Sequence, residues 1–132
     1  MATDFKCPHC SNLLNVGQNI VFTARNKWGK EGLIMLHPEI GNYTVLKHPN
    51  FEVHQGEMLD FYCLYCNKQL ISERNKNLAK ILMSDENGLE YEILFSRIAG
   101  QHATYKIIGE NYEIFGEDAS EYIDSLRDEN IF

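Results

Sequence analysis

The chain has 132 residues, of which 44% are hydrophobic and 23% charged, and its formal net charge is −7 at pH 7. This length and composition fit one ordinary folded domain and exclude a disordered or collagen-like chain. Residues 1–76 carry eight Lys and Arg against seven Asp and Glu, whereas residues 77–132 carry four against twelve. The acidic second half argues against a protein that coats nucleic acid with its whole surface.

The first half predicts a mostly β structure, because short runs of β-branched and aromatic residues alternate with turn residues. We expect a strand at residues 19–25 and a returning strand at 33–36. The returning strand is expected to be buried on both faces, since its residues do not alternate. Further strands are predicted at 42–47 and 57–62, and no internal repeat is evident.

A polar bridge at residues 72–77 separates two predicted units, 1–76 and 77–132, which can pack as one domain. The second unit is expected to begin with a four-stranded meander over 78–83, 89–95, 104–108 and 112–115. Asn87-Gly88 is a strong turn signal between the first two of these strands. In the second strand, Leu89, Tyr91, Ile93 and Phe95 fall on one face, with Glu90 and Glu92 on the other.

The chain is expected to close with an amphipathic helix from about Glu117 to Arg127. Helical spacing gives it one apolar stripe, formed by Ala119, Tyr122, Ile123 and Leu126. The expected fold class is therefore mostly β (α+β), a four-cysteine β unit followed by a β-meander and this helix.

The location expected for this chain is the cytoplasm. Residues 1–6 contain no apolar stretch typical of a secretion signal, and the longest aliphatic run, 33–36, is too short to span a bilayer. We therefore expect no membrane contact. In a reducing compartment, four cysteines favour metal binding over disulfides.

The first cysteine pair lies in the stretch DFKCPHCSN, as Cys7-Pro8-His9-Cys10. This motif resembles the active site of periplasmic thiol oxidases built on the thioredoxin fold. Such a site needs its cysteines at the start of a helix that follows a strand. Only six residues precede Cys7 and no helical pattern follows Cys10, which argues against a redox disulfide.

The second pair, Cys63 and Cys66, makes the metal interpretation specific. The chain contains C-x2-C, 52 intervening residues and a second C-x2-C, and these motifs use every cysteine. Cys7, Cys10, Cys63 and Cys66 together supply the tetrahedral set of thiolates that Zn²⁺ prefers. Lengthening the spacer from ~17 to 52 residues costs only about 1 kcal/mol of closure entropy, against ~10 kcal/mol from structural zinc.

These four cysteines resemble those of zinc-ribbon proteins, in which two knuckles on β-hairpins share one zinc ion. The resemblance implies one structural Zn²⁺ bound by Cys7, Cys10, Cys63 and Cys66. Zinc ribbons usually have a shorter spacer, and often a Gly after the second cysteine, where this chain has Ser11 and Asn67. Rubredoxins also resemble the chain in their C-x2-C pairs, which leaves an iron electron carrier as an alternative.

Enzymatic activity is not expected. Four cysteine ligands leave no open position for water on the metal, unlike a catalytic zinc site. The sequence contains no nucleophile elbow, P-loop or dinucleotide fingerprint. A second metal site built from His37, His48 and His54 stays open as a hypothesis.

A partner-binding site is suggested by Arg25, Lys27, Trp28 and Lys30, which lie near a predicted hairpin tip. The Trp can fill a pocket on a protein or stack on a base, while the cations meet acidic side chains or phosphate. The first hypothesis is a zinc-stabilised protein-interaction module. The alternative is a nucleic-acid-associated factor, for instance of the ribosome or transcription machinery, that binds through residues 25–30. Both a monomer and a homodimer fit the sequence.

Overall fold

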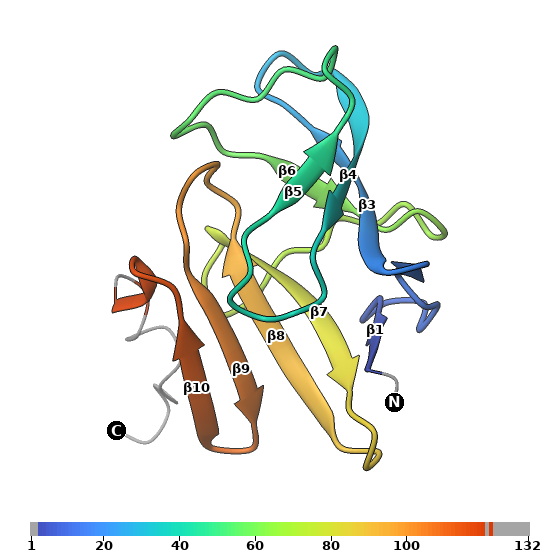
Figure 1. The fold of residues 1–132 in the computed structure, drawn as a ribbon, viewed down its shortest axis with the longest axis vertical. Helices are drawn as coiled ribbons and strands as arrows, with labels where there is room; N and C mark the ends of the chain where they lie inside the picture. Colours follow the sequence, from blue (N-terminus) through green and yellow to red (C-terminus); the bar gives the residue numbers. More distant parts are fainter. Residues whose placement is uncertain (1–2, 121, 123–132) are drawn as a thin grey trace.

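The computed structural model describes residues 3–120 and 122, which form two five-stranded antiparallel sheets (Figure 1). Sheet A has the order β1-β7-β8-β9-β10, and in sheet B, which has the order β2-β3-β4-β5, β6 also pairs with β3. The strands are β1 (Asp4–Lys6), β2 (Asn15–Val16), β3 (Asn19–Arg25), β4 (Glu31–Leu36), β5 (Val45–Lys47), β6 (Asp60–Tyr62), β7 (Leu78–Ser84), β8 (Glu90–Ser96), β9 (Thr104–Ile108) and β10 (Asn111–Phe115).

Most of the predicted strands are confirmed. The predicted meander is β7–β10, and its first hairpin turns at Asp85–Gly88, where the N–H of Gly88 donates to the Asp85 carbonyl. The short strands β1 and β2 were not predicted, because three and two residues are too few to show an alternating pattern. β1 extends the meander by pairing with β7, so the first residues of the chain belong to the second predicted unit's sheet.

The predicted C-terminal helix lies mostly outside the described residues. Among residues 3–120 and 122 there is no α-helix, and a turn at residues 117–118 leads into a 3₁₀ segment at residues 119–120. No helix in this described part is therefore long and apolar enough to cross a membrane. Two members of the predicted apolar stripe, Ala119 and Tyr122, are nevertheless buried. The apolar spacing thus identified these two buried side chains.

Sheet B has one face turned toward sheet A and one turned to solvent. The inward residues in one row are Phe22, Ile34 and Lys47, which lie opposite one another across β3, β4 and β5. On the outward side, termed the outer face of sheet B, the register places Val21, Thr23, Leu33, Met35, Leu46 and Tyr62. Leu33 is 52% exposed there, so the prediction that residues 33–36 are buried on both faces was wrong.

Sheet A is covered on both faces, and each face contributes to a different apolar core. The face toward sheet B includes Ile81 and Ile93, which pack with Phe22 and Phe61 of sheet B. The opposite face includes Leu94 and Tyr105, which pack with Ala119 and Tyr122. The face of β8 predicted to be polar from Glu90 and Glu92 therefore also carries a fully buried leucine.

The chain passes between the sheets twice within the described residues. It leaves sheet A after β1, builds all of sheet B, and returns to sheet A at β7. Each passage begins with one of the two C-x2-C motifs, directly after β1 and directly after β6. The cysteines are thus placed where both connections between the sheets run.

Candidate metal centre

The two C-x2-C motifs have the same local structure, called here knuckle 1 (residues 5–14) and knuckle 2 (residues 61–70). Both follow the pattern F-x-C-x2-C-x3-L, a ten-residue repeat that the sequence analysis missed. The N–H of Leu14 donates to the Phe5 carbonyl at 2.7 Å, and the N–H of Leu70 donates to the Phe61 carbonyl at 2.7 Å. All four of these Phe and Leu side chains are buried, so each knuckle is anchored in the core at both ends.

Each knuckle turns on a residue with positive φ directly after its second cysteine. Ser11 has φ of 65° and Asn67 has φ of 60°, in the left-handed region that non-glycine residues rarely adopt. The turn lets the N–H of Ser11 donate to the Cys7 carbonyl, as that of Asn67 does to the Cys63 carbonyl. Asn tolerates this conformation better than most residues. The small polar residues noted after each cysteine pair therefore have a geometric role.

The four Sγ atoms meet although the pairs are far apart in the sequence. All of them lie within 4.8 Å of one another. The Sγ atoms of Cys7 and Cys66 are 3.7 Å apart, as are those of Cys10 and Cys63. These separations are well above the ~2.05 Å of a disulfide bond, and all four cysteines are free thiols. The predicted ligands are thus brought together as one group.

These distances fit a tetrahedral metal site. With Zn–S bonds of about 2.3 Å, neighbouring sulfurs of a tetrahedron lie about 3.8 Å apart, close to the observed 3.7 Å. Backbone N–H groups of the x2 residues point at sulfur, because His9 donates to Cys7 and Tyr65 donates to Cys63, each at 3.3 Å. Such donors stabilise thiolate charge and orient the ligands. The four cysteines can therefore hold a metal ion.

The thiols are in unequal environments. Burial raises the pKa of Cys7 to about 12 and also raises the pKa of Cys63. The backbone N–H of Asn12, assisted by its side-chain amide at 3.4 Å from sulfur, lowers the pKa of Cys10 to about 6. A buried thiol stays neutral unless a cation compensates its charge, and a divalent metal supplies that charge.

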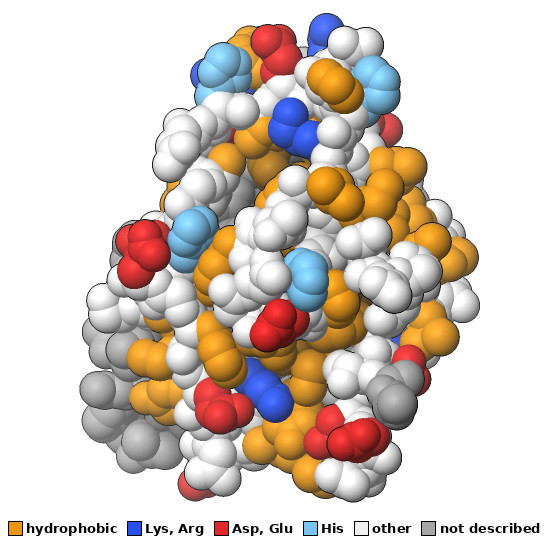
Figure 2. All heavy atoms as spheres, viewed as in Figure 1, with side chains coloured by type: hydrophobic (Ala, Val, Ile, Leu, Met, Phe, Trp, Pro, Cys, Tyr) orange, Lys and Arg blue, Asp and Glu red, His pale blue; other side chains and the backbone are white. Residues whose placement is uncertain are grey.

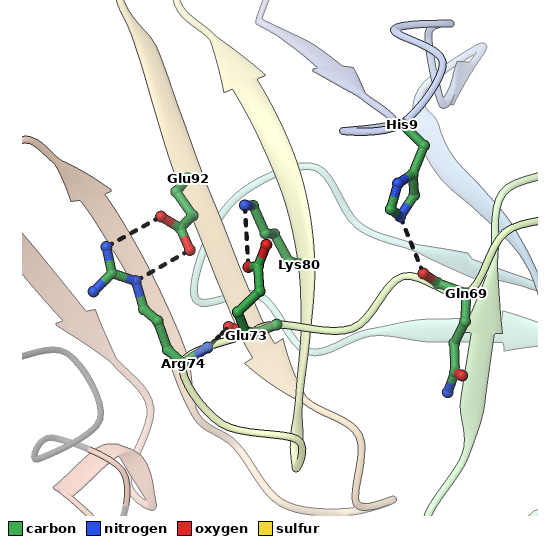
Figure 3. A network of polar contacts seen from close by, with 7 residues as sticks. His9, Gln69, Glu73, Arg74, Lys80 and Glu92 are labelled. Atoms are coloured by element: carbon green, nitrogen blue, oxygen red, sulfur yellow. Dashed lines mark hydrogen bonds and ion pairs between the residues drawn. The ribbon is translucent and has the colours of Figure 1, made fainter.

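A histidine joins the two knuckles outside the sulfur cluster. Nε2 of His9 lies 3.3 Å from the carbonyl oxygen of Gln69, so knuckle 1 contacts the end of knuckle 2 (Figure 3). His9 is otherwise exposed. Tyr65, at the equivalent position of knuckle 2, is also exposed. The two knuckles are therefore alike in backbone but differ at their tips.

The segment that follows knuckle 2 is fixed to sheet A by ion pairs. Arg74 contacts the Glu92 carboxylate with Nε at 3.2 Å and Nη2 at 3.3 Å, and Lys80 contacts Glu73 at 3.4 Å (Figure 3). Exposed pairs of this kind contribute about 0–1 kcal/mol each. Their main consequence is positional, because they hold the return passage against β7 and β8.

The other histidines do not gather into a second metal group. The cysteines are the sole set of three or more metal-binding side chains found in the described part of the chain. Nδ1 of His37 accepts the N–H of Glu39, and Nδ1 of His48 accepts the N–H of Asn50, each at 3.0 Å. The ring of His54 instead makes a T-shaped contact with the ring of Trp28.

The four predicted partner-binding residues lie at the β3–β4 hairpin. Arg25 forms an ion pair with Glu31 at 2.6 Å, which offsets its charge. Nζ of Lys27 lies 4.8 Å from the centre of the Trp28 ring, and Trp28 is 52% exposed. Lys30 is exposed at the turn. The structure thus leaves an accessible Trp beside two exposed lysines, with the third cation already paired.

A buried carboxylate that sequence analysis missed holds this hairpin in place. Glu57 is 7% exposed and accepts the N–H of Lys27 at 2.6 Å and that of His54 at 2.8 Å. Burial by itself raises the pKa of Glu57, but these two donors outweigh burial and the pKa is lowered. No local sequence signal marks Glu57, because one of its two donors, Lys27, comes from the distant β3–β4 turn, while His54 belongs to the same loop.

Comparisons of the chain with models of known protein families, with curated proteins and with solved structures found no match. The resemblance to zinc ribbons rests on the four cysteines and the two knuckles.

Proposed function

We propose that this chain is a non-catalytic protein stapled by one structural Zn²⁺ and that it acts as a protein-interaction module. The observation that carries the zinc assignment is the set of four thiols within 4.8 Å of one another, each pair presented by a knuckle of the same backbone conformation. A four-thiolate ion has no open position at which to activate water, which supports a structural role. Free thiols at this site suit the reducing environment of the cytoplasm.

Metal analysis of the purified chain tests the zinc assignment. We expect one zinc per chain, a colourless protein, and loss of cooperative folding when a strong chelator removes the metal. A red protein that contains iron and changes colour on reduction would instead support the rubredoxin-like alternative. Protein that is fully folded without any metal would contradict both assignments.

The outer face of sheet B supports the interaction role. Leu33 and Leu46 are 52% and 51% exposed there, and the register places Met35 between them. Trp28 extends from the tip of the hairpin that carries this face. Exposed apolar side chains that are contiguous on one face are typical of protein-binding surfaces.

A protein partner is favoured over nucleic acid by the pairing of the cations. Arg25 is paired with Glu31, so the net positive charge at the hairpin comes from Lys27 and Lys30 alone. Two cations give a weak electrostatic contribution to phosphate binding. Lys27 also lies over the Trp28 ring, on which a base would have to stack.

Affinity capture with a matched pair of variants tests the interaction role. A protein captured by the zinc-loaded wild-type chain should be lost with Leu33→Asp combined with Leu46→Asp. The same protein should be retained with Leu89→Asp, which adds a charge at an equally exposed leucine of the β7–β8 turn. Salt-sensitive RNA or DNA binding that is lost with Trp28→Ala combined with Lys27→Glu would favour the nucleic-acid alternative instead.

A further inference from the structure

A cavity of about 390 Å³ lies between the two sheets. Its apolar lining comes from both inner faces and includes Ile20, Ile34, Phe61, Ile81, Ile93 and Phe95. Figure 2 shows hydrophobic side chains at the bottom of a hollow in the upper half of the face drawn there, beside a basic side chain. Protein cores leave few voids larger than a water molecule, whereas a cavity of ~150 Å³ holds benzene. The space between the sheets therefore suits a ligand of roughly twice to three times that size.

The two charged residues that line this cavity are both basic, and two histidines lie beside them. Lys47, Arg97, His37 and His102 contribute to the lining, and no Asp or Glu of the described residues does. This is unexpected for a chain with 19 acidic and 12 basic residues. Two carboxylates outside the lining contact these groups: Asp60 pairs with Arg97, and Glu117 lies 3.6 Å from Nδ1 of His102. Lys47 is thus the lining cation without an ion pair to a described carboxylate, and it favours a ligand that carries a negative group.

Lys47 is the cation best placed to meet such a group. It projects from the inward side of β5, directly opposite Ile34, where an apolar residue would complete the row. Its Nζ donates to the Phe51 carbonyl at 2.9 Å, and no ion pair with a described carboxylate is formed. Arg97, by contrast, is paired with Asp60 and also donates to the carbonyls of Leu59 and Lys76.

One wall of the cavity is a stacked pair of aromatic rings. The rings of Tyr43 and His102 are 4.3 Å apart and nearly parallel. The hydroxyl of Tyr43 lies 2.8 Å from that of Thr104 and donates to the Phe115 carbonyl. These bonds fix the loop between β4 and β5 over sheet A, so the cavity has a defined wall.

We propose that this cavity binds an amphipathic carboxylate, with an alkyl chain of about ten carbons between the sheets and the carboxylate at Lys47. Apolar burial would drive binding of the chain, and the lysine would select a carboxylate over a neutral or cationic end. The proposal is independent of the metal-binding and partner-binding roles, because neither the cysteines nor the outer face of sheet B contributes to it.

Calorimetric titration of the zinc-loaded full chain with sodium decanoate, 1-decanol and decylamine tests this inference. We expect decanoate to bind with a stoichiometry of one, at least tenfold more tightly than decanol or decylamine. Lys47→Met should weaken decanoate binding at least tenfold and leave decanol binding unchanged. Lys76→Met, which removes an exposed lysine outside the cavity lining, should change neither.

A cavity-filling variant tests the location of the chain. Ile40 is a partly buried lining residue, so Ile40→Trp should abolish binding of all three ligands while zinc content and thermal unfolding are kept. Equal affinity for decanoate and decanol would overturn the role of the carboxylate. Absence of decanoate binding to folded wild-type protein, or binding unaffected by Ile40→Trp, would overturn the site.

Discussion

The Sγ atoms of Cys7 and Cys66 lie 3.7 Å apart, although 59 positions separate these residues in the chain. Cys7 follows a strand of sheet A, and Cys66 follows a strand of sheet B, in the knuckle that leads back to sheet A. A metal at this point would connect the edges of both sheets.

Replacement of one cysteine should remove the metal and most of the stability. We expect Cys7→Ser or Cys66→Ser to lower the free energy of unfolding by about 5 kcal/mol or more, since each removes one of the four ligands. Zinc content and chemical denaturation measure the effect. Leu64→Ser, an exposed change inside knuckle 2, is the control and should leave both values near wild type. Full thermal stability in either cysteine variant would contradict the metal site.

The residue after the second cysteine should tolerate glycine but not a branched side chain. Asn67 has φ of 60°, so Asn67→Val should cost about 1–2 kcal/mol, whereas Asn67→Gly should stay within ~0.5 kcal/mol of wild type. Lys68→Val, at the next position, controls for the loss of a polar side chain. Competition with a chromophoric chelator would show whether the strain also weakens metal binding. Equal stability of the Val and Gly variants would show that this turn does not constrain the knuckle.

Glu57 should make a pH-dependent contribution to stability. Its pKa is lowered in the folded chain, so its contribution is fully present above the unfolded pKa of about 4.5 and is lost as the pH falls through the folded value. At pH 7, Glu57→Gln should cost about 1–3 kcal/mol, because an amide cannot accept both N–H groups with two oxygens.

Urea denaturation of wild type and Glu57→Gln at several pH values measures this contribution. The difference between them should shrink below pH 4.5, and any acid-induced metal loss is common to both and cancels. Glu52→Gln, an exposed change in the same loop, should show no such difference. If the difference in the free energy of unfolding between wild type and Glu57→Gln does not vary with pH, the ionised carboxylate is ruled out as its source.

Gly116 should not tolerate a side chain. Its φ is +99°, and a Cβ atom would lie 2.2 Å from the carbonyl oxygen of His102 and 2.6 Å from the hydroxyl of Tyr43. We expect Gly116→Ala to cost about 3 kcal/mol or more, since backbone would have to move. Gly109→Ala, which also has positive φ but has open space around it, should cost only about 1 kcal/mol. Thermal unfolding distinguishes the two variants. Similar melting temperatures would show that the backbone around Gly116 can move at little cost in free energy to accommodate the Cβ atom.

The sequence predicted the metal-binding residues better than it predicted which strand faces are buried. The two C-x2-C motifs identified all four cysteines, because ligand type and spacing are local properties of the chain. The exposure of Leu33 and the burial of Leu94 were not predictable from their own strands. Alternation assigns a residue to a face, but a distant segment decides whether that face is covered. The pairing of β1 with β7 is likewise non-local, with Phe5 opposite Met83.

Both connections between the sheets begin at the knuckles, so the backbone from Ser11 to Tyr62 starts and ends at one point. With an ion bound, the chain segment that forms sheet B is held at both of its ends by the same metal site. Releasing the ion would free both of its ends together and leave the sheets joined by side-chain packing and by the backbone bonds between residues 56–59 and 97–99. Release of the metal would thus also loosen the cavity between the sheets, although no cysteine lines that cavity.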